Sequence, residues 1–392
     1  AKFTGSDMVD AKFNQSDLTE AVINGAKLSN ARFNECELSK VNLNKADLRD
    51  AGFLNSNMAE VDLNGSNLLG AEFSDSNLNK ASLREAKIKG NIFRNCQLQE
   101  IDLSHNDLTE SDFTDAQLTG ANLSHCDLTD ADLSGACLNK ANFTGVNLKD
   151  AIVVEAEISD ADFTEATFDY CDLSGSKIEN INLQGAKLIQ TDLQGLDLSK
   201  ALIKETSFVL CGMKKVNLEN KDLSNCDFTD SDLEEANLKN ARLDGAILTQ
   251  VNLSKADLSG ASLVKAICKT TLFRESNLEG ADLRGADLYC AQFMDAKLSK
   301  SNFSHTRLDR ANFTNADCRG SLFQNAQMPY SDLSHAILIQ ADFSGADLKQ
   351  SKLHRVDDRE ANWSGANLKL VEYTDADLAA AEEWQPPPAR ES

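Results

Sequence analysis

The chain has 392 residues, with 62 acidic and 39 basic side chains, a formal net charge of −23 and only 6% aromatic residues. A charge of this sign disfavours non-specific binding to nucleic acids and anionic membranes, so we expect neither among its direct partners. No stretch approaches the roughly 18 apolar residues that a transmembrane helix needs.

From its first residue the chain is an array of five-residue repeats, which begins AKFTG, SDMVD, AKFNQ, SDLTE. The register holds to residue 380 without an insertion or deletion, which makes 76 pentapeptides. All 18 Phe are the third residue of a pentapeptide, and 18 of the 20 Gly are the fifth. A period of five fits neither an α-helix nor a plain strand, so the chain must turn a corner every five residues.

The residue types predict which positions face inward. The large apolar third residue forms the core, and the small first residue lies beside it where space is short. The second residue, often Asp or Asn, faces outward, and Gly at the fifth suits a backbone conformation that other residues resist. Four such sides close a coil of twenty residues, and coils stack at about 4.8 Å. Phe recurs every twenty residues from Phe13 to Phe113, as four-sided coils require.

The repeat resembles the pentapeptide-repeat family, whose pattern is A-[DN]-[LF]-x-x. It reads ADLSG at 131–135 and 256–260 and ANFTG at 141–145. The resemblance covers essentially residues 1–380. It implies an all-β fold, a single right-handed quadrilateral β-helix (β-solenoid) of about 19 coils, in which stability is a sum over neighbouring coils.

Two places depart from the pattern. Asp358 stands at a third position, where a charge in the core is costly, so we expect coil 356–360 to be distorted or opened. Near 196–225 several small first residues are replaced, for example by Leu196, and Gly212 stands at a second position. We interpret this stretch as an irregular coil or slight kink, not a domain boundary.

The ends of the array differ. The motif is lost after Leu378, and residues 376–385 are expected to form a short helical turn over the final coil, with Trp384 as its apolar plug. Residues 381–392 are therefore interpreted as a C-terminal cap and disordered tail. At the other end Ala1 begins in register, and an open edge invites pairing. This favours either a larger parent protein or a homodimer through an end coil.

Two candidate partner surfaces follow from the twenty-residue period. Residues 101–200 contain 19 acidic and 5 basic residues, a net charge of −14. Within them four aspartates should lie along one side: Asp112, Asp132, Asp172 and Asp192. The second surface is apolar and consists of Ile247 and Ile267, which should stack, with Leu272 around the corner; the alternative is a local irregularity.

No residue pattern points to catalysis, a cofactor or a metal. None of the ten Cys forms a CxxC pair, and six occupy the small first position, so we interpret them as buried thiols in a reducing, cytoplasmic compartment. His105 and His125 should stack as exposed corner residues, although a metal there is conceivable. We therefore expect a protein that is not an enzyme.

Two functional hypotheses remain. The first is a protein-interaction or scaffold module, a rigid acidic rod belonging to a larger protein, with a protein partner of unknown identity. The second is a DNA-mimic regulator that binds a type II topoisomerase such as gyrase, as some members of the family do. The acidic stretch supports the second hypothesis, because regularly spaced carboxylates imitate the phosphates of duplex DNA.

Overall fold

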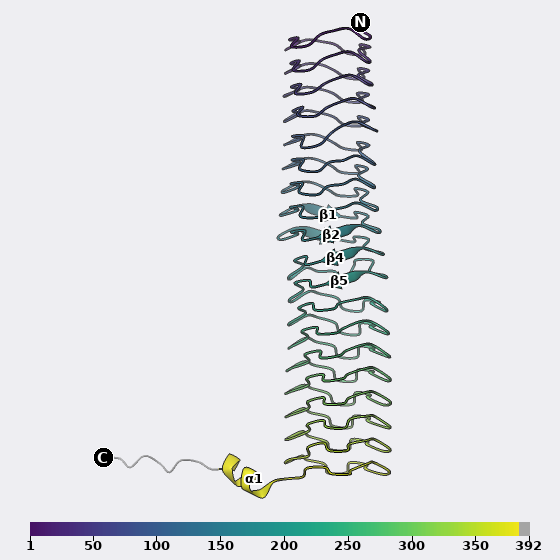
Figure 1. Cartoon of the computed structure of the whole chain (residues 1–392), viewed down its shortest axis with the longest axis vertical. Coiled ribbons are helices and arrows are strands. Elements are labelled where there is room, and N and C mark those ends of the chain that lie inside the picture. The colour runs from purple at the N-terminus through teal and green to yellow at the C-terminus, as the bar shows by residue number, and fades with distance from the viewer. Residues whose placement is uncertain (384–392) are drawn as a thin grey trace, which may run out of the picture. The chain divides into compact units, whose positions relative to one another are not determined.

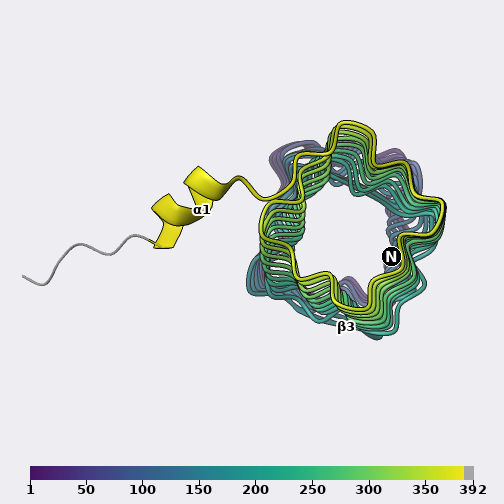
Figure 2. The same ribbon diagram turned by 90° about the horizontal axis from the view of Figure 1, so that it is seen from below.

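The computed structural model describes residues 1–383. The chain divides into two compact units, Ala1–Gly212 and a second unit that begins at Met213. Each unit is a β-helix of stacked coils (Figure 1), and each coil has four sides (Figure 2). The sequence predicted one array without a boundary. The division lies within the stretch in which small first residues are replaced.

Within each unit, neighbouring coils are joined by hydrogen bonds between residues about twenty apart in the sequence. The amide of Arg32 donates to the carbonyl oxygen of Ala11 at 2.9 Å, and the amide of Phe33 donates to that of Gly52 at 2.8 Å. The resulting bridges are parallel and centred on the second residue of each pentapeptide. We call residues that share a position in successive coils, twenty apart, a column.

The fourth and fifth residues of each pentapeptide form the turn between two sides. The fifth residue adopts the left-handed conformation, with φ of 57° at Glu35 and 73° at Gly70. This explains why Gly concentrates at the fifth position. The amide of the following residue then donates a hydrogen bond to the carbonyl oxygen of the third residue, for example from Ala31 to Leu28 at 3.0 Å.

The Asp or Asn at the second position stabilises this turn. Oδ1 of Asp132, for example, accepts a hydrogen bond from the amide of Ser134 at 2.9 Å. Asn142 does the same for the amide of Thr144 at 3.0 Å. The preference for these two residue types therefore has a local structural cause in addition to solvent exposure.

The core consists of the first and third residues. The Phe column from Phe13 to Phe113 forms a continuous stack, with neighbouring ring centroids 4.9–5.1 Å apart and ring planes within 5° of parallel. From Phe33 on, these rings are completely buried. The predicted ladder is thus confirmed.

Regular strands occur in the later part of the first unit, where the second to fourth residues of a pentapeptide are extended. They are β1 (Glu157–Ser159), β2 (Thr167–Asp169), β3 (Lys177–Glu179), β4 (Lys187–Ile189) and β5 (Ser207–Val209). β1 pairs with β3, and β2, β4 and β5 form a second sheet in that order, all parallel.

One helix, α1 (Ala376–Glu383), follows the last coil of the second unit. It lies within residues 376–385, where the sequence predicted a short helical turn, although its first residues also fall in the range predicted as repeat. The predicted position over the final coil is wrong for the described residues, because α1 lies to the side of that coil (Figure 2). Trp384, the expected plug, is outside the described residues. No helix in residues 1–383 is long and apolar enough to span a membrane.

The coil that contains Asp358 keeps its turn, contrary to the distortion that the sequence predicted. The amide of Ala361 donates to the carbonyl oxygen of Asp358 at 2.9 Å, as in the other coils. The Asp358 side chain is exposed, because the residues that would form the next coil, from Ala376 on, are helical. In the same coil Trp363 stacks on Phe343, with ring centroids 4.4 Å apart.

Candidate interaction surfaces

The four aspartates of the acidic stretch lie in one column of the first unit. Bridges join Asp112 to Asp132 and Asp172 to Asp192. Ile152 occupies the place between the two pairs, and its side chain is 44% exposed. The predicted column therefore exists, with one apolar interruption.

Each of these carboxylates is oriented by its own turn. Oδ1 accepts the amide two residues later, at 2.9 Å for Asp132, Asp172 and Asp192 and at 3.0 Å for Asp112. At Asp112, burial raises the pKa, but hydrogen bonds from Thr114 and Arg94 outweigh it and hold the pKa below its usual value. The carboxylate of Asp112 is thus ionised at neutral pH.

The apolar surface predicted in the second unit is also present. Ile247 and Ile267 are bridged partners in one column. Ile267 is 37% exposed, and Leu272, on the adjoining side, is 36% exposed. Three apolar side chains thus reach solvent around one corner of the second unit.

Aromatic and arginine side chains extend this surface. The Arg307 guanidinium lies 4.9 Å from the centre of the Tyr289 ring, and that of Arg310 lies 5.3 Å from the centre of the Tyr330 ring. Tyr330 is 48% exposed. Arg307 belongs to the column of Ile247 and Ile267.

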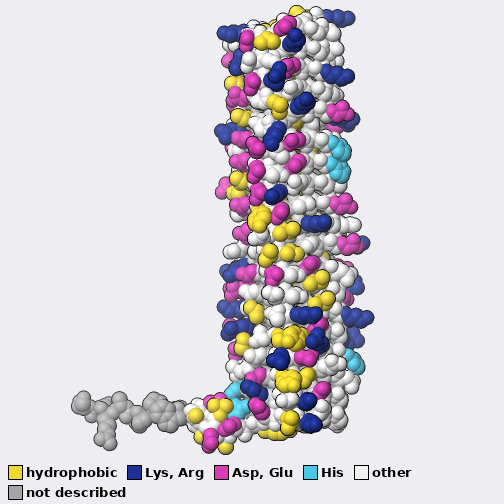
Figure 3. All heavy atoms as spheres, viewed as in Figure 1, with side chains coloured by type: hydrophobic (Ala, Val, Ile, Leu, Met, Phe, Trp, Pro, Cys, Tyr) yellow, Lys and Arg dark blue, Asp and Glu magenta, His cyan; other side chains and the backbone are white. Residues whose placement is uncertain are grey.

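We call this set the Tyr–Arg surface; it consists of Ile247, Ile267, Leu272, Tyr289, Arg307, Arg310 and Tyr330. Hydrophobic and basic side chains lie next to one another over the second unit in Figure 3. The sequence carried a signal for the two tyrosines, because they stand at turn positions that small polar residues usually hold.

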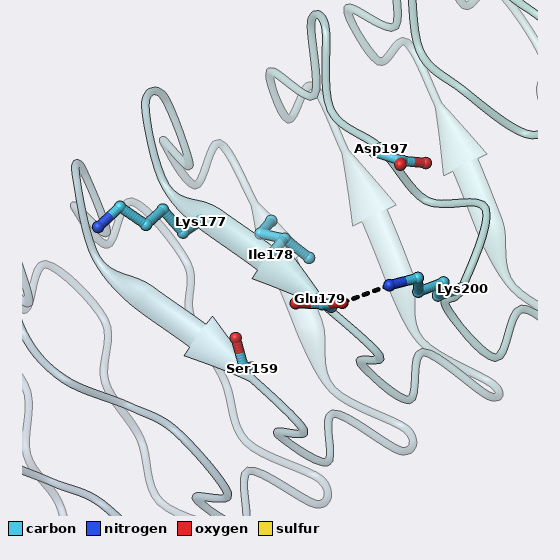
Figure 4. Close-up of a pocket in the computed structure, with 6 residues that line it drawn as sticks. All are labelled: Ser159, Lys177, Ile178, Glu179, Asp197 and Lys200. Carbon is cyan, nitrogen blue, oxygen red and sulfur yellow. Dashed lines mark hydrogen bonds and ion pairs between the residues drawn. The ribbon is translucent and has the colours of Figure 1, made fainter.

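A cavity of about 360 Å³ lies beside β3 in the first unit (Figure 4). Its lining is charged and polar, with an ion pair between Lys200 and Glu179 and with Asp197, Lys177 and Ser159 around it. Ile178, a third-position residue, is only half-buried here. Leu196, one of the replaced first residues, directly precedes Asp197 of this lining.

The cysteines are all free thiols, and eight of the ten are buried. Burial raises the pKa of Cys96 and of Cys126 to about 12, so these thiols are unreactive at neutral pH. His105 and His125 stack with ring centroids 4.9 Å apart, as their spacing predicted.

Two family models match most of the chain. One is described as a pentapeptide repeat region and the other as pentapeptide repeats in eight copies; they match residues 6–83, 86–163 and 161–238, and residues 252–288, 291–328 and 316–355, respectively. The chain belongs to the pentapeptide-repeat family. The resemblance drawn from the repeat motif is thus confirmed, and a comparison with curated proteins found no match.

Several solved structures are similar to this pentapeptide-repeat chain. A trypsin-treated variant of QnrB1, a plasmid-mediated fluoroquinolone resistance protein, is 21% identical over 50% of this chain and 92% of its own, with a TM-score of 0.37. HetL from the cyanobacterium Nostoc sp. is 24% identical over 71% and 88%, with a TM-score of 0.15. A pentapeptide-repeat protein of the Arabidopsis thaliana thylakoid lumen is 28% identical over 24% and 63%, with a TM-score of 0.20. Scores this low mean that the family assignment rests on the repeat itself.

Proposed function

We propose that this pentapeptide-repeat chain is a non-enzymatic protein-interaction module that binds a protein partner through the Tyr–Arg surface. The observation that carries the proposal is the pairing of exposed Tyr and Arg with Ile and Leu at one corner of the second unit. Tyr and Arg are enriched among the residues that dominate binding energy at protein interfaces. Presentation on stacked coils reduces the entropy lost on binding.

The charge of this region indicates the chemistry of the partner. Residues 246–330, which include the Tyr–Arg surface, contain ten basic and eight acidic residues, a net charge of +2 in a chain of net charge −23. An acidic protein surface with a central apolar group would complement it in both charge and hydrophobicity.

The test is capture of partners from cell extract by the whole chain and by a surface variant, Ile267→Asp with Arg307→Ala. The matched control is Arg284→Ala with Arg319→Ala, which removes two exposed arginines of the same unit that lie outside the Tyr–Arg surface. We expect the surface variant to lose partners that the control retains. Equal capture by both variants would reject this surface.

A second candidate function, DNA mimicry towards a type II topoisomerase such as gyrase, is supported by the acidic stretch. Five coils at strand spacing extend for about 24 Å. The net charge of −14 in residues 101–200 then amounts to about one negative charge per 1.7 Å, which equals the axial charge density of duplex DNA.

The test for mimicry is a gyrase supercoiling assay with a variant in which four aspartates become asparagines: Asp112, Asp132, Asp172 and Asp192. Asn supports the same turn as Asp in this chain, so the variant removes charge and keeps the coil. Mimicry predicts that the wild-type chain inhibits or protects gyrase at micromolar concentration and that the variant does so at least about tenfold less. No effect of the wild-type chain would exclude it.

The proposal also includes the handedness of the β-helix, its number of coils and its cellular location. We retain a right-handed helix of about 19 coils, which the family implies. A cytoplasmic location is supported by the ten free thiols, because such thiols persist in a reducing compartment.

A further inference from the structure

Three potential metal-ligating side chains meet where α1 contacts the coils of the second unit. His335 and His354 come from adjoining coils, and the amide of His335 donates to the carbonyl oxygen of His354 at 2.8 Å. Glu382 comes from α1. Histidine atoms and acidic atoms lie together at the base of the helix in Figure 3.

The distances between these side chains suit a small metal ion. Nε2 of His335 lies 3.3 Å from Oε1 of Glu382, and Nε2 of His354 lies 3.3 Å from Oε2. One ligand atom from each residue lies within 4.8 Å of the other two. Around a tetrahedral Zn²⁺ with bonds of about 2.0–2.1 Å, neighbouring ligand atoms are roughly 3.4 Å apart.

We propose that His335, His354 and Glu382 form a binding site for Zn²⁺ or a similar transition-metal ion. Two imidazoles and one carboxylate are a ligand set that Zn²⁺ takes readily, whereas Mg²⁺ and Ca²⁺ prefer oxygen ligands alone. Only 9% of the His354 side chain is exposed, so one ligand is held in place before the metal binds.

The fourth position of the site would face a cavity of about 490 Å³. Asp332, Ser334 and Tyr373 line this cavity beside the three ligands. Water, or an oxygen atom of one of these side chains, would complete the coordination.

Two hydrogen bonds in the structure must change when the ion binds. The amide of Asp375 donates to Nδ1 of His354 at 3.2 Å, so the imidazole carries its proton on Nε2 and donates it to Glu382. Coordination through Nε2 places the remaining proton on Nδ1 and releases the Asp375 amide. The second hydrogen bond is the one that the Arg355 guanidinium donates to Glu382 at 3.0 Å. Arg355 also donates to Glu383, so it keeps an acidic partner when Glu382 binds the ion.

Binding of the ion would therefore fix α1 against the side of the coils. The helix is held by hydrogen bonds and ion pairs that centre on Glu382, and none of its side chains is buried. Coordinate bonds to the ion from two histidines of the coils and one carboxylate of the helix would replace the contacts of Glu382.

The test is calorimetric titration of the whole untagged chain with Zn²⁺ at pH 7.5, after removal of metals with a chelator. We expect one ion per chain. The affinity should fall by at least about 100-fold in His335→Ala and in Glu382→Gln, because loss of a ligand exceeds the 10–100-fold effect of losing an outer partner. Glu382 is on the exposed helix, so its variant should keep the coils folded, which circular dichroism verifies.

The matched control is His105→Ala with His125→Ala, which removes the other pair of neighbouring histidines, and it should bind Zn²⁺ as the wild type does. Amide exchange in α1 should slow on addition of Zn²⁺ and stay unchanged with Mg²⁺. The proposal is overturned if the wild type binds no Zn²⁺, or if binding survives His335→Ala and Glu382→Gln together, which would place the ion at thiols or surface carboxylates.

Discussion

Replacement of Phe53 by Ala should open the coil that contains it. Phe53 is completely buried, and the ring centroids of Phe33 and Phe73 lie 5.1 Å away on either side. A Phe→Ala change in a core costs about 3–5 kcal/mol. Each lost ring pair adds about 0.5–1.5 kcal/mol where its geometry is favourable.

Replacement of Phe53 by Leu separates these two contributions. Leu occupies most other third positions of the array, so it fits the coil, and we expect a loss of about 1–2 kcal/mol. A double-mutant cycle of Phe53→Leu with Phe73→Leu should give a coupling of about 0.5–1.5 kcal/mol. The matched pair, Phe53 with Phe113, is separated by two intervening rings and should couple by less than about 0.5 kcal/mol.

The assay must resolve single coils, because a stack of repeats does not unfold in one step. Amide hydrogen exchange of residues 41–60 reports the free energy of local opening, and urea unfolding followed by circular dichroism reports the whole unit. A loss below about 1 kcal/mol for Phe53→Ala would refute the conclusion that the Phe column holds the coils together.

Three further predictions follow from the same structure. An uncharged aromatic disulfide reagent should modify only Cys137 and Cys290 rapidly in the folded chain, and all ten thiols in denaturant; rapid reaction of more than two would contradict the burial of the others. Stability should fall below about pH 4, since hydrogen bonds from the residue two positions later hold the pKa of several second-position carboxylates below their unfolded value: Asp17, Asp47, Asp222, Asp282 and Asp357. The contribution of these groups to the free energy of unfolding is complete above their unfolded pKa and is lost as pH falls through their folded pKa. Asp282→Asn should therefore reduce the loss of stability in acid, measured by urea unfolding at each pH. An unchanged pH profile would show that Asp282 does not contribute to it. Finally, Asp358→Leu should stabilise the last coil by about 1 kcal/mol, because it restores an apolar third residue in the column of Leu338, whose neighbour Ile337 is bridged to Asp357; slower amide exchange in residues 341–365 would support this and faster exchange would reject it.

The sequence was sufficient to predict the repeat, the positions that face inward and the Phe column, because all of these depend on the period alone. Columns of surface residues followed from the same period, which is why Ile247 and Ile267 are partners as expected. The turn-stabilising role of second-position Asp and Asn was not recognised, although their frequency at that position was visible.

Features that depend on the end of the array were harder to predict. Asp358 has the wrong character for a core position, and only the structure shows that no further coil among residues 1–383 covers it. The meeting of His335, His354 and Glu382 depends on how α1 turns away after Asp375, and no period specifies the direction of that turn. The cation–π pairs were missed because side-chain direction at a corner is not part of the repeat.

The twenty-residue coil limits how a chain of this kind can lengthen during evolution. Duplication of twenty residues adds one coil and returns every later residue to its original side. Duplication of only five preserves the inward and outward alternation but moves all later residues by a quarter turn, which would split the Phe column or the acidic column at the site of insertion. Selection for folding alone therefore tolerates growth in steps of five, whereas selection for a continuous surface column tolerates only whole coils.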